Sequence, residues 1–265
     1  CLAETGYSLS RIADTQAGVD PAFIDGRRWV DEAMPPGERV QIIASSFGDP
    51  AAAYGVWWDI GYWNSSTDRV LTHLATPDLQ QPFPEQFVVT PGGEFGIWDA
   101  VSIPGSGALG PGPWFVMAAS DRTFGFRDAE VVAERFGVLL LRTEGPPKAA
   151  WALYGAADDT GRLLAGSPPA ELLLFPRDGA ASGTVAAKVT LTGLPGSLEG
   201  GRFAAGDERG RVAPGEGETA TVRVDAPVGE DGTAHVALQA LGRPAPAADG
   251  QAPRGVQVAG VELLE

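Results

Sequence analysis

The sequence predicts two domains of different architecture: an α/β domain with a largely parallel sheet, followed by an antiparallel β-sandwich domain. The first observation is the distribution of aromatic residues. Six of the seven tryptophans lie between Trp29 and Trp114, and only two phenylalanines follow Tyr154. The second is a change of hydrophobic period, from helix–strand alternation to short strands between Gly- and Pro-rich turns. We place an N-terminal extension or post-membrane linker at 1–19, the α/β domain at 20–147 and a jelly-roll-like β-sandwich at 148–265.

The α/β assignment rests on helices that alternate with apolar strands. A helix is predicted at 21–34, because Asp20 is a favourable N-cap, Pro21 suits the first helical position and a Pro-Pro-Gly sequence follows the helix. A buried strand is predicted next, at 39–45. The other elements predicted for this domain are a short helix at 50–61, strands at 86–90, 114–119 and 138–143, and a helix at 128–136. The strand at 138–143 contains a continuous apolar run, which is typical of a sheet covered on both faces.

The sandwich assignment rests on alternation of apolar and polar residues with period two. The alternation is clearest at 219–225, and no pattern of helical length occurs in this half. Strands are predicted at 171–175, 184–192, 219–225, 233–241 and 255–264. The domain boundary is placed at Pro146-Pro147, because two consecutive prolines restrict the backbone and donate no ladder hydrogen bonds.

Composition excludes several classes of function. The formal net charge of −15 argues against nucleic acids and anionic lipid surfaces as partners, because both bind to positive surfaces. Cys1 is the only cysteine, so no disulfide forms within the chain. We expect no metal and no cofactor, since the two histidines and the carboxylates show no ligand spacing. A loop calcium at the edge of the sandwich is an alternative, with Asp158, Asp159, Glu230 and Asp231 as its ligands.

Catalytic and phosphate-binding motifs are weak. The glycines at 105–110 match G-x-G-x-x-G, but prolines on both sides exclude the strand and helix that a dinucleotide loop requires, so we expect an ordinary loop. No G-x-S-x-G elbow occurs. Two carboxylates that converge in the fold would be needed for a glycosidase, and the sequence leaves this possibility open.

The densest aromatic cluster is the candidate ligand-binding segment. Aromatic rings stack on the CH faces of sugars, and neighbouring Asp or Asn side chains bind hydroxyl groups. The alternative is that the rings fill the core between a short helix and the sheet. The candidate ligand contacts are Trp57, Trp58, Asp59, Tyr62, Trp63 and Asn64.

An ordered set of motifs points to a family. Trp-Val-Asp at 29–31 is followed by Pro-Pro-Gly at 35–37, by the aromatic segment and its continuation at 58–70, by Phe-Gly-Val-Leu-Leu-Leu-Arg at 136–142, and by Ala-Leu-Tyr-Gly at 152–155. This order resembles the extracytoplasmic C-terminal region of actinobacterial membrane glycosyltransferases, multi-pass proteins similar to dolichyl-phosphate-mannose protein mannosyltransferases. The chain departs from the family pattern in two places: the segment 62–66 lacks its arginine, and Leu141 replaces its tyrosine.

The resemblance implies a function. This chain would be an extracytoplasmic, non-catalytic module that binds an acceptor or glycan. The membrane-embedded part of the same polypeptide would tie it to the cytoplasmic membrane and carry the catalytic acids for transfer from a lipid-linked sugar. One alternative is a lipoprotein anchored through Cys1 whose sandwich binds carbohydrate. The other is a secreted glycosidase.

Overall fold

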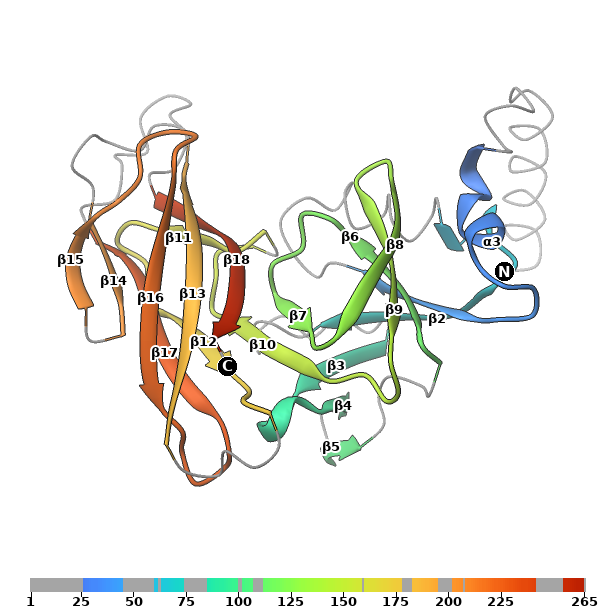
Figure 1. Cartoon of the computed structure of the whole chain (residues 1–265), viewed down its shortest axis with the longest axis horizontal. Coiled ribbons are helices and arrows are strands. Elements are labelled where there is room, and N and C mark those ends of the chain that lie inside the picture. The colour runs from blue at the N-terminus through green and yellow to red at the C-terminus, as the bar shows by residue number, and fades with distance from the viewer. Residues whose placement is uncertain are drawn as a thin grey trace, which may run out of the picture.

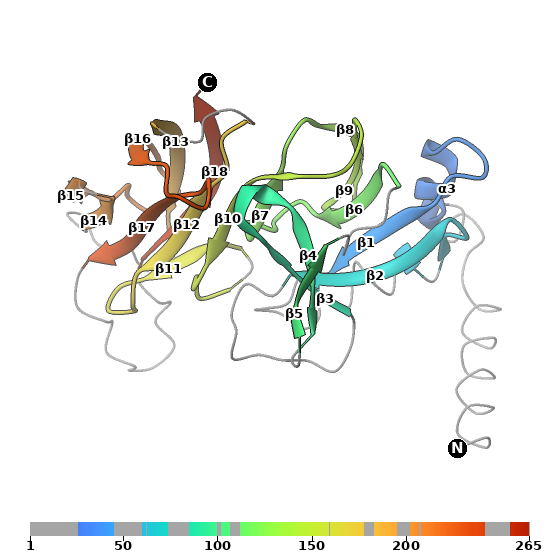
Figure 2. The same cartoon turned by 90° about the horizontal axis from the view of Figure 1, so that it is seen from below.

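The computed structural model describes residues 26–44, 60–61, 63–73, 85–99, 102–106, 112–158, 160–177, 183–194, 202–206, 208–241 and 255–264. Within these ranges the chain is β-rich and forms three sheets, which Figure 1 and Figure 2 show from two directions. The helices described in these ranges include none that is both long and apolar enough to span a membrane.

The first sheet is mixed, with a parallel centre and antiparallel flanks. Its pairings are parallel between β3, β2, β1 and β6, and antiparallel elsewhere. In spatial order its strands are β5 (Ser102–Ser106), β4 (Phe95–Asp99), β3 (Glu85–Val89), β2 (Thr67–His73), β1 (Val40–Ala44), β6 (Trp114–Ala118), β9 (Val138–Thr143) and β8 (Ala129–Arg135). The predicted strands at 39–45, 86–90, 114–119 and 138–143 are confirmed. The last of these, however, pairs antiparallel with β6.

The predicted helix at 128–136 is wrong, because this segment is strand β8. Val131 and Val132 are both exposed, and the segment pairs antiparallel with β9. Neighbouring β-branched residues favour extended backbone. Gly137, directly after the segment, is the second residue of a tight hairpin turn. The spacing of apolar residues in this short segment is compatible with a helix, but the segment forms one strand of a hairpin.

The turn of this hairpin contains an unfavourable residue. Phe136 and Gly137 both have positive φ, of 54° and 72°. A two-residue turn of this kind favours Asn-Gly, because a bulky residue with positive φ is sterically strained. We expect Phe136→Asn to raise the free energy of unfolding by about 0.5–1 kcal/mol, measured by urea denaturation. An unchanged or lower value would contradict this account of the turn, and Phe136→Ala is the control that removes the ring without relieving φ.

Helix α3 (Trp29–Ala33) packs on one face of the mixed sheet and confirms part of the helix predicted at 21–34. Residues 21–25 lie outside the described ranges. Trp29 and Val30 are buried with side chains of β1, β6 and β9. Met34 is extended and precedes the two prolines, which cannot continue a helix. The helix therefore ends where the sequence predicts.

The second half contains two antiparallel sheets. One has the order β15 (Glu208–Val212), β14 (Arg202–Ala205), β17 (Ala234–Leu241), β12 (Ala170–Leu174), β10 (Ala149–Tyr154) and β7 (Phe124–Phe126). The other has the order β11 (Arg162–Leu164), β18 (Gly255–Leu264), β13 (Thr184–Gly193) and β16 (Thr219–Pro227). All five predicted strands of this half are present, and one core cluster joins side chains of both sheets, such as Leu172 and Val222. The packing is sandwich-like.

The two halves share a sheet and a core. Strand β7 precedes Pro146-Pro147 in the chain, yet it pairs with β10 beyond these prolines. A second cluster of buried residues joins Phe87 and Phe115 of the first half to Phe175 of the second. Side chains add hydrogen bonds across the junction, since Arg122 Nε donates to Ala259 O at 2.8 Å. The change of core composition near Pro146 thus marks the start of a second core cluster. The two halves remain joined by a shared sheet and shared core contacts.

Candidate functional site

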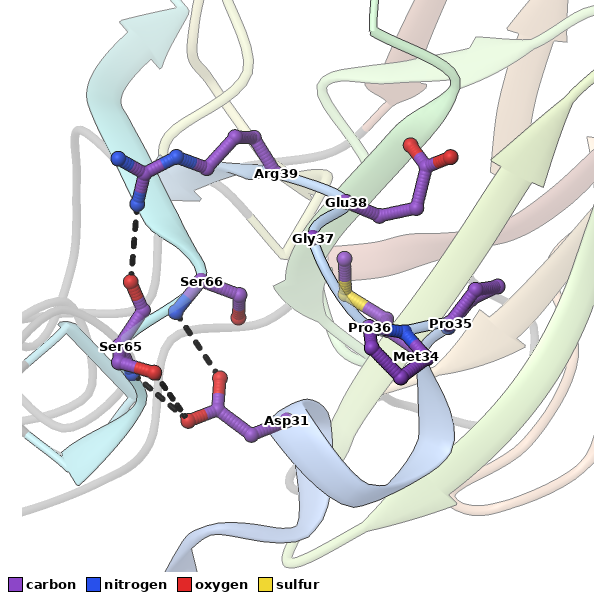
Figure 3. Close-up of a pocket in the computed structure, with 9 residues that line it drawn as sticks. All are labelled: Asp31, Met34, Pro35, Pro36, Gly37, Glu38, Arg39, Ser65 and Ser66. Atoms are coloured by element: carbon purple, nitrogen blue, oxygen red, sulfur yellow. Dashed lines mark hydrogen bonds between the residues drawn. The ribbon is translucent and has the colours of Figure 1, made fainter.

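A pocket of about 230 Å³ lies where helix α3, the turn after it and the turn before β2 meet (Figure 3). Pro35, Gly37 and Glu38 are exposed at its rim, whereas Met34 is buried beneath it. The pocket is lined by Asp31, Met34, Pro35, Pro36, Gly37, Glu38, Arg39, Ser65 and Ser66.

Parallel pairing of β1 and β2 explains why these residues meet. The first residues of the two strands, Val40 and Thr67, are partners in the ladder, so the segments that enter the strands lie side by side. The Val40 N–H also donates to Ser66 O at 3.0 Å. Gly37 has a φ of 89°, which lets the chain turn sharply from α3 into β1. The pocket therefore forms at the N-terminal ends of two adjacent parallel strands.

The carboxylate of Asp31 holds the two turns together. Its Oδ2 accepts hydrogen bonds from Ser65 N at 2.8 Å and Ser65 Oγ at 2.9 Å, and its Oδ1 accepts one from Ser66 N at 2.9 Å. Arg39 Nη1 donates to Ser65 O at 2.9 Å. Partial burial favours the neutral acid, but hydrogen bonding by Ser66 and Ser65 outweighs it and lowers the pKa of Asp31. The carboxylate is consequently ionised at neutral pH.

The pocket can bind a small polar group but is poorly suited to catalysis. Pro35, Pro36 and Met34 supply apolar surface, while Glu38 supplies an acceptor and Arg39 a donor. Ser65 Oγ donates to a carboxylate whose pKa is low, and such a carboxylate is a weak general base. The volume lies below the range of about 300–1,000 Å³ typical of sites for drug-sized ligands. A ligand unit the size of one sugar ring fits this scale.

The predicted aromatic segment lies next to this pocket in the chain. Trp57, Trp58, Asp59 and Tyr62 lie outside the described residues, so their predicted role stays a prediction. Trp63 is half-buried.

Asn64 is buried, with 4% exposed surface, and its side chain is used within the fold. Asn64 Oδ1 accepts from Asp31 N at 3.0 Å, and Nδ2 donates to Arg27 O and Ile60 O, each at 3.0 Å. Both N–H groups of this amide are therefore engaged, and Asn64 orients the helix beside the pocket.

Calcium at the predicted edge residues finds no support in the described part of the chain. Asp158 accepts from Thr160 and pairs with Arg162, while Asp231 accepts from Thr233 N. Asp159 lies outside the described residues. Among the residues that the structure describes, no group of three His, Cys, Asp or Glu side chains is placed to hold a metal ion. Gly105 and Ser106 belong to strand β5 and not to a loop, and residues 107–110 of that glycine motif lie outside the described ranges.

No sequence motif singles out His73, yet this residue lies at the centre of the junction between the halves. The ring is 1% exposed, stacks on Phe87 at 5.2 Å and meets Phe124 and Tyr154 edge-on at 5.3 Å each. His73 Nε2 is 3.3 Å from the Tyr154 hydroxyl, which donates to Val89 O. Burial lowers the pKa of His73 to about 3 and raises that of Tyr154 to about 12. Both rings are neutral at neutral pH.

Comparison with known proteins identifies no relative. A scan against protein-family models, a search of curated proteins and a search of solved structures found no match to this chain.

Proposed function

We propose that this chain is an extracytoplasmic, non-catalytic module of a membrane glycosyltransferase that uses a lipid-linked sugar, and that it binds the acceptor or glycan at the pocket beside Asp31. One observation carries the proposal. Residues from three motifs of the resemblance meet at this pocket: Asp31 of the motif at 29–31, the Pro-Pro-Gly at 35–37, and Ser65 and Ser66 of the segment at 58–70. Motifs that keep their order in the sequence and meet at one surface are the arrangement expected of a shared site.

The chemistry of the pocket supports a glycan ligand. A sugar presents hydroxyl groups, which both donate and accept hydrogen bonds, and CH faces, which pack on apolar surface. Glu38 and Arg39 offer an acceptor and a donor at the rim, and the rings of Pro35 and Pro36 offer an apolar face.

The proposal includes an architecture and a location. An α/β organisation of residues 20–147 is supported by the four parallel strands β3, β2, β1 and β6 and by helix α3 on one face. In the proposed parent protein the module is attached to the cytoplasmic membrane by the membrane-embedded part of the same polypeptide. The acidic net charge of −15 suits a neutral glycan better than an anionic one.

The test is binding of the isolated chain to an array of neutral oligosaccharides, followed by titration of each hit with tryptophan fluorescence. We expect Glu38→Gln and Arg39→Gln to weaken binding, because they change the acceptor and the donor at the rim of the pocket. The matched control is Ser120→Ala, because Ser120 follows β6, which is parallel to β1, and so lies at the opposite end of the sheet. No hit on the array, or hits that all three variants bind equally well, would contradict the proposed site.

A further inference from the structure

Among the residues that the structure describes, strand β8 is an edge of the mixed sheet and carries exposed apolar side chains. It ends the mixed sheet, and the tip of the β8–β9 hairpin projects at the top of the first half in Figure 1. Three large apolar residues are exposed in the described chain, and all lie in this hairpin: Val131 at 55%, Val132 at 38% and Phe136 at 78%. A free edge with apolar side chains is a template for pairing with another strand.

A bulge in β8 changes which of its residues share a face. The register is irregular between Val131 and Ala133. On one side of the bulge Glu130 is opposite Arg142, and on the other Arg135 is opposite Val138. Arg142 and Val138 are separated by an even number of positions on β9, so they lie on one face, and their partners lie on that face too. Glu130 and Arg135 therefore share a face although an odd number of positions separates them.

The turn and the bulge also determine the direction of the backbone groups of β8. Arg135 and Val138 flank a two-residue turn, so they form a hydrogen-bonded pair, and their N–H and C=O groups point toward each other. Because of the bulge, the backbone N–H and C=O groups of Glu130 also point toward β9. Those of Val131 and Glu134 point to the free edge. A second strand must pair through these outward groups.

We propose that β8 pairs antiparallel with β8 of a second copy of this chain, in a two-fold register that places Glu130 opposite Arg135 and Val131 opposite Glu134. In this register the outward groups of Val131 meet those of Glu134. Two Glu–Arg pairs of opposite charge form across the two-fold axis, and each such cross-strand pair is stabilising. The ring of Phe136 lies opposite the small side chain of Ala129, which leaves it room to pack.

Other symmetric registers are disfavoured by charge. A two-fold axis at Glu130 or at Glu134 would place each of these carboxylates opposite its own copy, and like charges directly opposite are destabilising. The charges that normally protect an edge strand from unspecific pairing are thus complementary in the proposed register and repulsive in these two. The interface is a single strand of seven residues, so we expect the association to depend on protein concentration.

The first test is sedimentation velocity over a wide range of protein concentration, with charge-reversal variants. Glu130→Arg and Arg135→Glu should each weaken dimerisation about tenfold, because each places like charges opposite in both pairs. The double variant should restore dimerisation, since it exchanges the partners without changing the net charge. Glu130 and Arg135 are both exposed, and circular dichroism checks that the variants are folded.

The second test fixes the register by disulfide formation in a Cys1→Ser background. In the proposed register, Glu130 and Arg135 of different copies are a non-hydrogen-bonded pair, with Cβ atoms about 4.5–5.5 Å apart. The double variant Glu130→Cys/Arg135→Cys should form a covalent dimer on mild oxidation. Neither single variant should form a covalent dimer, because its two cysteines, one on each copy of the chain, lie about 17 Å apart along the strands.

Several outcomes would overturn the proposal. One is a monomer at all concentrations. Another is a dimer in which the double charge variant stays weakened, or in which a single cysteine variant forms a disulfide as readily as the double. A monomeric chain that binds phosphatidylcholine vesicles, and loses this binding in Phe136→Asn, would instead assign the hairpin to a membrane surface.

Discussion

As the pH is lowered from roughly 6 to 4, the free energy of unfolding should fall by about 1.4 kcal/mol for each pH unit because of His73 alone. The pKa of this ring is about 3 in the folded chain, against an ordinary value of 6.5. Below pH 6.5 the unfolded chain binds a proton that the folded chain excludes, so acid favours unfolding. Above pH 6.5 both states are neutral and this contribution to the pH dependence vanishes. The accumulated loss by pH 4 is about 3 kcal/mol.

The variant His73→Gln isolates this effect, because glutamine does not titrate. Urea denaturation of the wild-type chain and the variant, at a series of pH values, gives two curves whose difference reports His73. The variant loses ring packing and is expected to be less stable at pH 7, yet its stability should fall less steeply in acid. Parallel curves between pH 6 and pH 4 would contradict the buried neutral histidine.

His235 provides a control with the opposite sign. A hydrogen bond with Glu171, at 2.7 Å from His235 Nδ1, raises the pKa of this exposed ring. Its stabilising contribution is present below pH 6.5, where the ring is charged in both states, and is lost as the pH rises through the folded pKa. His235→Gln should therefore reduce stability in mild acid and leave the alkaline side unchanged.

Asn64→Ala should lower the free energy of unfolding by about 2–4 kcal/mol. The substitution removes three hydrogen bonds, to Asp31 N, Arg27 O and Ile60 O, from a side chain that is 4% exposed. Polar backbone groups left without a partner in a buried place carry a large cost. Chemical denaturation at neutral pH measures the loss, with an unchanged dependence on denaturant if the folded state stays compact.

The matched comparison is Ser65→Ala, on the adjacent residue. Ser65 is exposed, and the substitution removes only one side-chain hydrogen bond, to Asp31. Its expected cost is about 1 kcal/mol. If Asn64→Ala proves as mild as Ser65→Ala, Asn64 does not hold the helix and the turn together, and its amide is free to contact a ligand.

The fold of the second half could be predicted because its strands bury one face only. In β13 and β16 buried and exposed residues alternate along the whole strand, and this period of two is visible in the sequence. In the first half the spacing of apolar residues is a weaker guide to the strands. Strand β2 was not predicted, because its last positions, Thr72 and His73, are polar residues that the fold buries. Hydrophobic patterning does not detect a buried polar residue.

The candidate site, like the fold, could be predicted from the sequence only in part. The sequence directed attention to the segment 57–64, and of its predicted contacts only Trp63 and Asn64 are described. The pocket beside it depends on the parallel pairing of β1 with β2, which brings Asp31 to Ser65 and Ser66 across more than thirty positions. No local pattern encodes that pairing. The order of the motifs at 29–31, 35–37 and 58–70 was the only signal in the sequence that related these residues.

The central claim is that a glycan binds beside Asp31, and the most direct measurement is a two-dimensional ¹H–¹⁵N NMR titration of the folded chain. The titrant is a neutral oligosaccharide that binds on the array. We expect saturable shifts of the amides of Asp31, Glu38, Arg39, Ser65 and Ser66, with little change in the four-stranded sheet of the second half. Shifts confined to that sheet, or none at saturating sugar, would contradict the claim.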